Sequence, residues 1–468
     1  MRRVVSLAPE SPGFNAFEWL TSVWVATVLH VMASLLDYRS SSLAPNGLLD
    51  TPRHYRVTLQ VCALLVPLSV FPLIWMGGLV TSHGVGMSVP DWPNSYGYNM
   101  FLFPPSKWVG GIFYEHTHRL LGTLSGFLTV MLAIMTWGPA RFARRRKAIG
   151  YVSVALWVGF AVSLAIKLVM YRNGSISYDT AKMISHVYVM FASLGLVMTV
   201  AYFAVAQDPR RWVRWFTIGL LALVITQGTL GGLRVTEVST ELAIVHACTA
   251  QLFFTLSAFA ALVMSRWWSK SREGSTTNAP QFQNYARLFR VTTTTVLVLT
   301  FCQLIAGALM RHNGAGLAIP DVPLAYGKLI PPTDSASLAA ANDVLKWTHH
   351  LPEVSLAQIW MHASHRIGAV LVSVCVLIAA GIAFVKLRES RAVVISAAIL
   401  LVLVTTQFTL GVLTVYWQKP ADIASLHVAV GALTLLTTGQ ALAVVSRLSV
   451  RRVASVRETA PSGVLVNA

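Results

Sequence analysis

The sequence predicts an all-α polytopic membrane protein, and three of its features support this fold class. Of its 468 residues 55% are hydrophobic and only 12% are charged, and the mean hydropathy is +0.62. Apolar stretches of roughly twenty residues, such as 57–80 and 291–309, are long enough to cross about 30 Å of hydrocarbon. Basic residues gather in short tracts between these stretches. Together these features exclude the two or three soluble domains that the length alone would suggest.

The apolar stretches predict ten membrane-spanning helices, whose ends are defined by the pattern only to within several residues. They are expected at 57–82, 116–138, 149–170, 182–205, 214–234, 242–264, 290–310, 362–385, 392–415 and 423–446. Residues 19–36 are apolar enough to form an eleventh span or an interfacial helix. No small-residue cleavage site follows them closely, so a cleaved signal peptide is less expected.

The formal net charge of +18 does not indicate a nucleic-acid partner, because the basic residues follow the membrane pattern instead. Every second loop is rich in arginine and lysine; these tracts lie at 141–147, 210–214, 266–287, 386–391 and 447–457. This alternation is typical of cytoplasmic loops. We therefore expect an integral protein of a bacterial-type cytoplasmic (inner) membrane. Its C-terminus is expected in the cytoplasm, and its N-terminus too unless residues 19–36 span the bilayer.

All four cysteines, Cys62, Cys248, Cys302 and Cys375, fall inside predicted spans. Cysteines placed there do not indicate a structural disulfide between outer loops. They are expected to act as small packing residues within the bundle.

Two pairs of segments reveal an internal repeat. Residues 86–97 and 316–327 are identical at six of twelve positions and share the pattern Gly-x-x-x-Pro-Asp-x-Pro. Residues 226–233 and 406–413 are identical at six of eight positions, with the pattern Thr-Gln-x-Thr-Leu-Gly. The two pairs occur in the same order and in matching places relative to the spans. The repeat unit is therefore four helices, and the two copies are parallel repeats.

This repeat divides the chain into two four-helix bundles. We expect an N-terminal extension at 1–56, an N-terminal bundle at 57–270, a C-terminal bundle at 285–450 and a disordered tail at 451–468. A pair of helices at about 149–205 has no counterpart in the second copy and is interpreted as an insertion.

Four histidines lie near the outer ends of corresponding helices. His118 and His365 open one pair of equivalent spans, and His246 and His427 open another. At a rise of about 1.5 Å per residue, the two histidines of each bundle lie at nearly equal depth. Two imidazoles at one depth across a helical bundle are what axial heme ligation requires. A lone histidine at a helix end is usually an ordinary interfacial residue, but the paired arrangement favours metal ligands.

Other residues near the histidines could have more than one role. Arg119 and Arg366 each follow a histidine directly and could reach heme propionates. His186, on an inserted helix, is the alternative to His246 as a ligand. Glu115 lies one turn before His118, where the second half has His362 instead. Glu115 is either a catalytic carboxylate or a solvated residue favoured by the helix dipole.

Over residues 57–446, apart from the inserted helices, the sequence resembles the heme A synthase family. The resemblance rests on Glu-x-x-His-Arg at 115–119, on His-Arg at 365–366, on the later histidines at 246 and 427, on the two proline loops and on the parallel repeat. The family's cysteine pair in the first outer loop is missing here.

This resemblance implies specific roles for the two halves. The C-terminal half would hold heme b, an iron cofactor, through His365 and His427, with Arg366 beside it. The N-terminal half would bind heme O through His118 and His246, with Arg119 beside it and Glu115 as the catalytic residue. There a methyl group of heme O would be oxidised through an alcohol to the formyl group of heme A.

The resemblance also implies partners and leaves competing functions open. Heme A would serve heme-copper terminal oxidases, so heme O synthase and oxidase assembly factors are expected partners, with an unknown electron donor. A diheme b-type cytochrome for electron transfer and a heme-handling membrane transporter are the competing functions. Equivalent sites in both halves would favour the cytochrome, and the difference between Glu115 and His362 argues against it.

Overall fold

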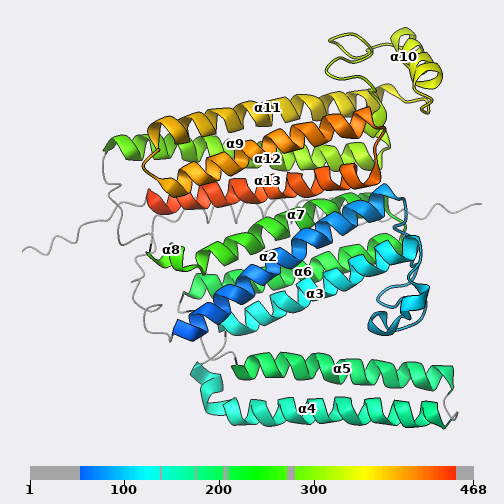
Figure 1. Ribbon diagram of the computed structural model, residues 1–468, viewed down its shortest axis with the longest axis vertical. Helices are drawn as coiled ribbons and strands as arrows, with labels where there is room; N and C mark the ends of the chain where they lie inside the picture. Colours follow the sequence, from blue (N-terminus) through cyan, green and yellow to red (C-terminus); the bar gives the residue numbers. More distant parts are fainter. Residues whose placement is uncertain are drawn as a thin grey trace, which may run out of the picture.

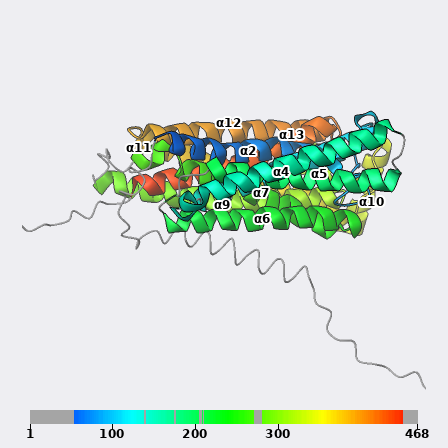
Figure 2. The ribbon, with the colours of Figure 1, turned by 90° about the horizontal axis from the view of Figure 1, so that it is seen from below.

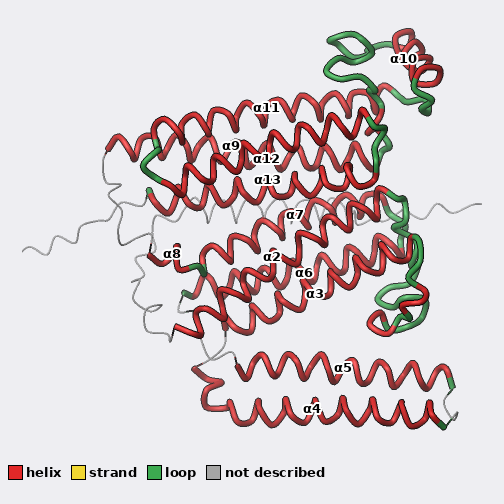
Figure 3. The backbone as a smooth tube through the Cα atoms, viewed as in Figure 1, coloured by secondary structure: helices red, strands yellow, loops and turns green. Residues whose placement is uncertain are grey.

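The computed structural model describes residues 53–137, 140–173, 177–203, 208, 210–270 and 280–449 (Figure 1). The possible span at 19–36 and the tail at 451–468 lie outside these described residues. Within them the regular structure is helical (Figure 3), which confirms the predicted all-α class. Short 3₁₀ segments lie at Met100–Leu102, Pro105–Lys107 and Ala315–Leu317.

Ten of the described helices are long and apolar enough to cross a membrane, which confirms the predicted number. They are α2 (Arg53–Ser82), α3 (Gly111–Trp137), α4 (Ala140–Arg172), α5 (Tyr178–Phe203), α6 (Arg211–Thr236), α7 (Thr240–Val263), α9 (Pro280–His312), α11 (Leu356–Lys386), α12 (Arg391–Tyr416) and α13 (Ala421–Leu448). The four cysteines lie in α2, α7, α9 and α11 and are free. The short helix α8 (Arg266–Lys270) follows α7.

One helix was not expected from the sequence. Helix α10 (Ser335–Thr348) lies in the long loop between α9 and α11. Asp334 begins this helix with a capping box. Its side chain accepts from the backbone N–H of Ser337, and the Ser337 hydroxyl accepts from the backbone N–H of Asp334. Such a cap satisfies N–H groups that the first helical turn leaves without partners.

Eight of the spanning helices form two groups of four. In the N-terminal group α2, α3, α6 and α7 contact one another in that cyclic order, and in the C-terminal group α9, α11, α12 and α13 do so. Neighbouring helices in each cycle run side by side (Figures 1 and 2). The groups meet where α13 packs on α2 and α7, and where α7 packs on α9. One apolar core extends over this boundary, since Ala432 and Ala443 of α13 belong to the core of the N-terminal group.

Helices α4 and α5 form a hairpin at the edge of the N-terminal group (Figure 1). They pack mainly on each other, and α5 also contacts α3. Large apolar side chains of α4 such as Tyr151, Val154 and Leu168 are more than half exposed, as expected of a surface that faces lipid. The backbone N–H of Asp208 donates to the Thr136 carbonyl at 3.1 Å. The chain therefore leaves the N-terminal group and returns to it at one point.

The two long loops, 83–110 and 313–355, project from the same end of the bundle (Figure 3). We call this end the loop end. Because α2 and α9 both finish there while α3 and α11 begin there, their terminal residues are brought together beneath the loops. This end of the molecule holds the predicted histidines.

Candidate functional site

The predicted histidines face each other in two pairs at the loop end. The imidazole centroids of His118 on α3 and His246 on α7 are 6.4 Å apart, with an angle of 81° between the rings. The centroids of His365 on α11 and His427 on α13 are also 6.4 Å apart, with an angle of 67°. In each group the two histidines come from helices at opposite corners of the cycle. His186 lies on α5, outside the N-terminal cycle, and His246 occupies the position opposite His118.

The spacing of both pairs suits an ion bound between two imidazoles. Bonds of about 2 Å from a shared metal to facing ring nitrogens place the ring centroids about 6 Å apart. Neither pair has a third ligand, because the described residues contain no group of three or more histidine, cysteine, aspartate or glutamate side chains able to hold a metal. Two axial imidazoles without further protein ligands are the donor set of a heme, whose porphyrin supplies the other four nitrogens.

Each of the four histidines packs against a glycine of a neighbouring helix. A Cβ atom on Gly77 of α2 would lie 2.9 Å from Cε1 of His118, and one on Gly231 of α6 would lie 3.1 Å from Cε1 of His246. The equivalent distances are 3.0 Å from Gly307 to His365 and 3.3 Å from Gly411 to His427. These glycines let each imidazole lie directly on the adjacent helix backbone.

Backbone and amide groups orient the imidazoles. Nδ1 of His118 lies 3.2 Å from the Leu73 carbonyl, a contact in which Nδ1 donates and Nε2 is left for a metal. Nδ1 of His365 lies 3.0 Å from the Gln303 amide, whose nitrogen also donates to the His365 carbonyl at 2.7 Å. Among the described residues, Nδ1 of His246 and Nδ1 of His427 are buried without a hydrogen-bond partner, and the Gln227 amide donates to the His246 backbone carbonyl at 3.2 Å.

The two proline loops have the same internal bonds. Asp91 accepts from the backbone N–H groups of Tyr96 and Gly97, both at 2.7 Å. Asp321 accepts from Tyr326 and Gly327, both at 2.8 Å. The Tyr326 hydroxyl donates to the Ala318 carbonyl. Burial, helped by the negative charge of Asp321, raises the pKa of Tyr326 to about 12, so the phenol keeps the proton that it donates.

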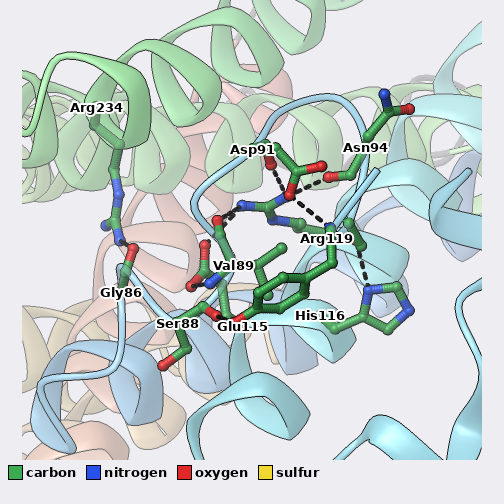
Figure 4. Close-up of polar contacts among 11 residues, drawn as sticks. Gly86, Ser88, Val89, Asp91, Asn94, Glu115, His116, Arg119 and Arg234 are labelled. Carbon is green, nitrogen blue, oxygen red and sulfur yellow. Dashed lines mark hydrogen bonds and ion pairs between the residues drawn. The ribbon is translucent and has the colours of Figure 1, made fainter. Parts of the chain in front are cut away.

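Arg119 and Arg366 hold these loops onto the bundle. Nη1 of Arg119 donates to the carbonyls of Asp91 at 2.5 Å and Asn94 at 2.8 Å, and Nη2 donates to the Val89 carbonyl at 2.5 Å (Figure 4). Arg366 makes the same three bonds in the second half; its acceptors are the carbonyls of Asp321, Leu324 and Ile319. A propionate role for either arginine stays a prediction, and it would require these guanidinium groups to give up loop carbonyls.

Glu115 and His362 occupy equivalent places beneath the loops. The Val89 N–H donates to Oε2 of Glu115 at 2.9 Å, and the Ile319 N–H donates to Nδ1 of His362 at 3.2 Å. Both side chains are only 3% exposed, so Glu115 is buried and not solvated. Its other oxygen accepts from Arg119 at 2.8 Å (Figure 4). The N-terminal half thus has a buried carboxylate–guanidinium pair where the C-terminal half has a histidine and an arginine.

Comparison with known proteins shows the family of the chain. The family described as "Cytochrome oxidase assembly protein" (COX15-CtaA) matches residues 179–438, which is more than half of the chain. A heme A synthase of Anaplasma marginale (strain Florida) is 30% identical over 274 residues, 57% of this chain and 72% of that protein. The chain belongs to the heme A synthase family of cytochrome oxidase assembly proteins.

Other heme A synthases match over different shares of their length. That of Rhodopseudomonas palustris is 32% identical over 231 residues, which cover 48% of this chain and only 56% of the relative. That of Bacillus mycoides is 23% identical over 368 residues, 78% of this chain and 86% of the relative. The COX15-CtaA match contains His246, His365 and His427, whereas Glu115 and His118 precede it. The assignment of His118 as one member of the N-terminal histidine pair therefore depends on the geometry given above.

Sequence reasoning missed the glycines and glutamines that support the histidines. Gln227 and Gly231 lie four residues apart in the repeated Thr-Gln-x-Thr-Leu-Gly segment, and Gln407 and Gly411 do so in its copy. That spacing places both residues on one helix face, which is a signal that could have found them. Gly77 and Gly307 lie in equivalent helices, each nine residues before the first glycine of the proline loop. The repeat could therefore have found them too.

Proposed function

We propose that this chain is a heme A synthase, an oxidoreductase that converts heme O to heme A in the membrane. The observation that carries the proposal is the presence of two matched imidazole pairs with unlike surroundings. His365 and His427 would be the axial ligands of heme b in the C-terminal half, 285–450. His118 and His246 would bind heme O as substrate in the N-terminal half, 57–270.

The residues at each pair fit a heme. The 6.4 Å spacing between ring centroids leaves room for one iron. The two histidines of each group lie on opposite helices of the cycle, so the space between their rings is bounded by the other two helices. Each of these two helices has a glycine that faces the site. Bound heme b would supply one-electron redox chemistry. The protein's own part is to fix both imidazoles on rigid helices, as a preorganised site requires.

Glu115 is the candidate catalytic residue, because it is the acidic group that distinguishes the two halves. With water as the source of the oxygen atom and an external electron acceptor, oxidation of a methyl group through an alcohol to a formyl group removes electrons and releases protons. A carboxylate at the loop end can accept a proton. Its bonds to Arg119 and to the Val89 N–H hold it in one position. In the C-terminal half His362 occupies this place, its Nδ1 already accepts from the Ile319 N–H, and the heme there is proposed to stay chemically unchanged.

The proposed setting follows from the charge pattern. The loop end would face the outside of a bacterial-type cytoplasmic membrane, since the arginine-rich tracts lie at the opposite end. Heme O would come from a heme O synthase, and heme A would pass to heme-copper oxidases through their assembly factors.

The test is to identify the pigments of the purified protein. Hemes are extracted from wild type and from Glu115→Gln, made in cells with and without heme O, and analysed by mass spectrometry. We expect hydroxylated or formyl heme in wild type only when heme O is supplied, and a loss of conversion in Glu115→Gln with the heme b spectrum kept.

The histidine variants test the two sites separately. His365→Ala and His427→Ala should each remove the low-spin bis-imidazole signal of heme b, while His349→Ala, in the loop after α10, should keep it. Recovery of heme b alone under every supply would replace the proposal with a diheme electron-transfer cytochrome. A full bis-imidazole signal in His365→Ala would overturn the assignment of the C-terminal site.

A further inference from the structure

Two arginines at the loop end lie close to the histidine pairs on helices that carry no ligand histidine. Arg234 of α6 follows Gly231 by three residues, and Arg311 of α9 follows Gly307 by four. Each arginine is therefore one turn further toward the loop end than a glycine that supports a ligand, on the same helix face. Both side chains are half-buried.

Neither arginine has a carboxylate partner, since the ion pairs found among the described residues involve other side chains. Arg234 has one long hydrogen bond, from Nη2 to the Gly86 carbonyl at 3.4 Å (Figure 4). Arg311 uses Nη2 for both of its bonds, to the Gly78 carbonyl at 2.7 Å and to Oγ of Ser82 at 2.6 Å. Within the part of the chain that the structure describes, Nη1 and Nε of each guanidinium donate no hydrogen bond.

Arg119 and Arg366 differ from Arg234 and Arg311 in how many of their hydrogen-bond donors the protein already uses. Arg119 and Arg366 use both terminal nitrogens on loop carbonyls. A charged group inside a membrane protein is costly to keep without a partner and tends to mark a functional site. Donors left over on Arg234 and Arg311 are therefore suited to an anion that the protein itself does not provide.

The positive charges are concentrated beside the histidine pairs. Arg234 lies one turn beyond Gly231, which packs against His246. Arg311 donates to Oγ of Ser82, which lies 3.0 Å from Oγ of Ser425, two residues before His427. Glu115 is the acidic group on which Arg234 acts, and it is already bonded to Arg119. A porphyrin held between the imidazoles would thus meet a guanidinium at its edge toward the loop end.

We propose that Arg234 and Arg311 bind the carboxylate groups of the porphyrins, Arg234 in the N-terminal site and Arg311 in the C-terminal site. This inference rests on the proposed function, because it requires a porphyrin between each imidazole pair. Guanidinium groups recognise carboxylates through two parallel hydrogen bonds, for which both arginines have free donors. The subsites are not equivalent in the repeat: Thr414 stands at the position of Arg234, and Thr81 at that of Arg311.

The test compares protoheme with its dimethyl ester, in which the two carboxylates are neutral. Each probe is titrated into the full-length protein in detergent and followed by the visible spectrum. The C-terminal site is measured in a His118→Ala/His246→Ala background and the N-terminal site in a His365→Ala/His427→Ala background. The variants are Arg311→Gln and Arg234→Gln. The control is Arg388→Gln, an exposed arginine between α11 and α12 at the opposite end.

We expect Arg311→Gln to weaken protoheme binding at the C-terminal site by about tenfold or more, as loss of a charge-assisted contact should. The same variant should bind the dimethyl ester as the unsubstituted protein does. Arg234→Gln should behave likewise at the N-terminal site, and Arg388→Gln should change neither.

Three results would overturn the inference. Unchanged protoheme binding in Arg311→Gln and Arg234→Gln would do so directly. An equal loss for both probes would assign the arginines to packing and not to carboxylate recognition. Failure of the unsubstituted protein to bind protoheme would remove the proposed function as well. Tight, carboxylate-dependent binding without any conversion of heme O would leave the arginine subsites in place and overturn only the synthase activity.

Discussion

The contact between a histidine and a glycine on the next helix is the smallest unit from which both sites are built. It occurs four times, and in each case a Cβ atom added to the glycine would lie between 2.9 and 3.3 Å from Cε1 of the histidine. Real Cβ atoms rarely approach a neighbour so closely, so any larger residue displaces either the ring or the helix. The position of each imidazole therefore depends on the absence of a side chain across from it.

This dependence predicts the effect of Gly307→Ala. The new methyl group would lie 3.0 Å from Cε1 of His365, and the ring would have to move. We expect loss or weakening of the heme b signal, together with about 1–3 kcal/mol of destabilisation from overpacking. Visible spectra and thermal unfolding in detergent measure the two effects. Gly381→Ala, on α11 with no atom within 4 Å of the new Cβ, is the control, and equal behaviour of the two variants would contradict the prediction.

Sequence alone predicted the candidate ligand histidines, but it did not predict the hydrogen bonds of the residues beside them. The histidine pairs followed from the repeat and from helical depth, because both depend only on spacing. The bonds of Arg119 and Arg366 did not follow, because an arginine beside a ligand could turn equally well toward a heme or toward the loop. The path of the loop decides between the two, and only the structure gives that path. The same holds for Glu115, whose partner Val89 is 26 residues away along the chain.

At the scale of helices, hydropathy was a sufficient guide for the spans and insufficient for the loops. A spanning helix is specified by a long apolar stretch, so the ten spans could be located before the structure was known. Helix α10 has only 14 residues and no such stretch. It depends on its Asp334–Ser337 capping box and on the burial of Ala341 and Leu345 against the rest of the loop, which no span-length pattern reveals.

The α4–α5 hairpin should be removable. Because the Asp208 N–H is bonded to the Thr136 carbonyl at 3.1 Å, a short glycine–serine linker could join Trp137 to Asp208 in place of 138–207. We expect the shortened protein to fold and to bind heme at both imidazole pairs, as visible spectra and heme content per chain would measure.

The same experiment decides the role of His186, which the excision removes. His186→Ala in the full-length chain is the matched variant and should also keep the spectrum of the N-terminal site. A loss of heme from that site in both proteins would make His186, and not His246, the ligand opposite His118.

At the scale of the whole molecule, the two halves are joined close to both histidine pairs. A Cβ atom on Gly78 of α2 would lie 2.9 Å from Cβ of Ser425 on α13, two residues before His427. The Ser425 hydroxyl also lies 3.0 Å from that of Ser82. Gly77, which supports His118, is the residue before Gly78. A displacement at this boundary is therefore transmitted to a histidine on each side.

We expect Gly78→Ala to perturb both sites, whereas Gly307→Ala should perturb only the C-terminal one. The added methyl group must push α2 and α13 apart, since the atoms it meets include backbone of α13. Redox titration of each site in the single-site backgrounds measures the effect as a shift of both midpoint potentials. Gly228→Ala on α6 has open space around its new Cβ and serves as the control. A shift confined to one site would show that the halves behave independently.

The single point at which the hairpin departs and returns has a consequence for biogenesis. A translocon that inserts spans one after another reverses direction with each of them, so an added pair leaves every later span with its original polarity. The six spans that follow the hairpin, three of which contain the proposed ligand histidines, thus enter the bilayer as they would without it. A single extra helix at the same point would invert them all and carry His246, His365 and His427 to the wrong face.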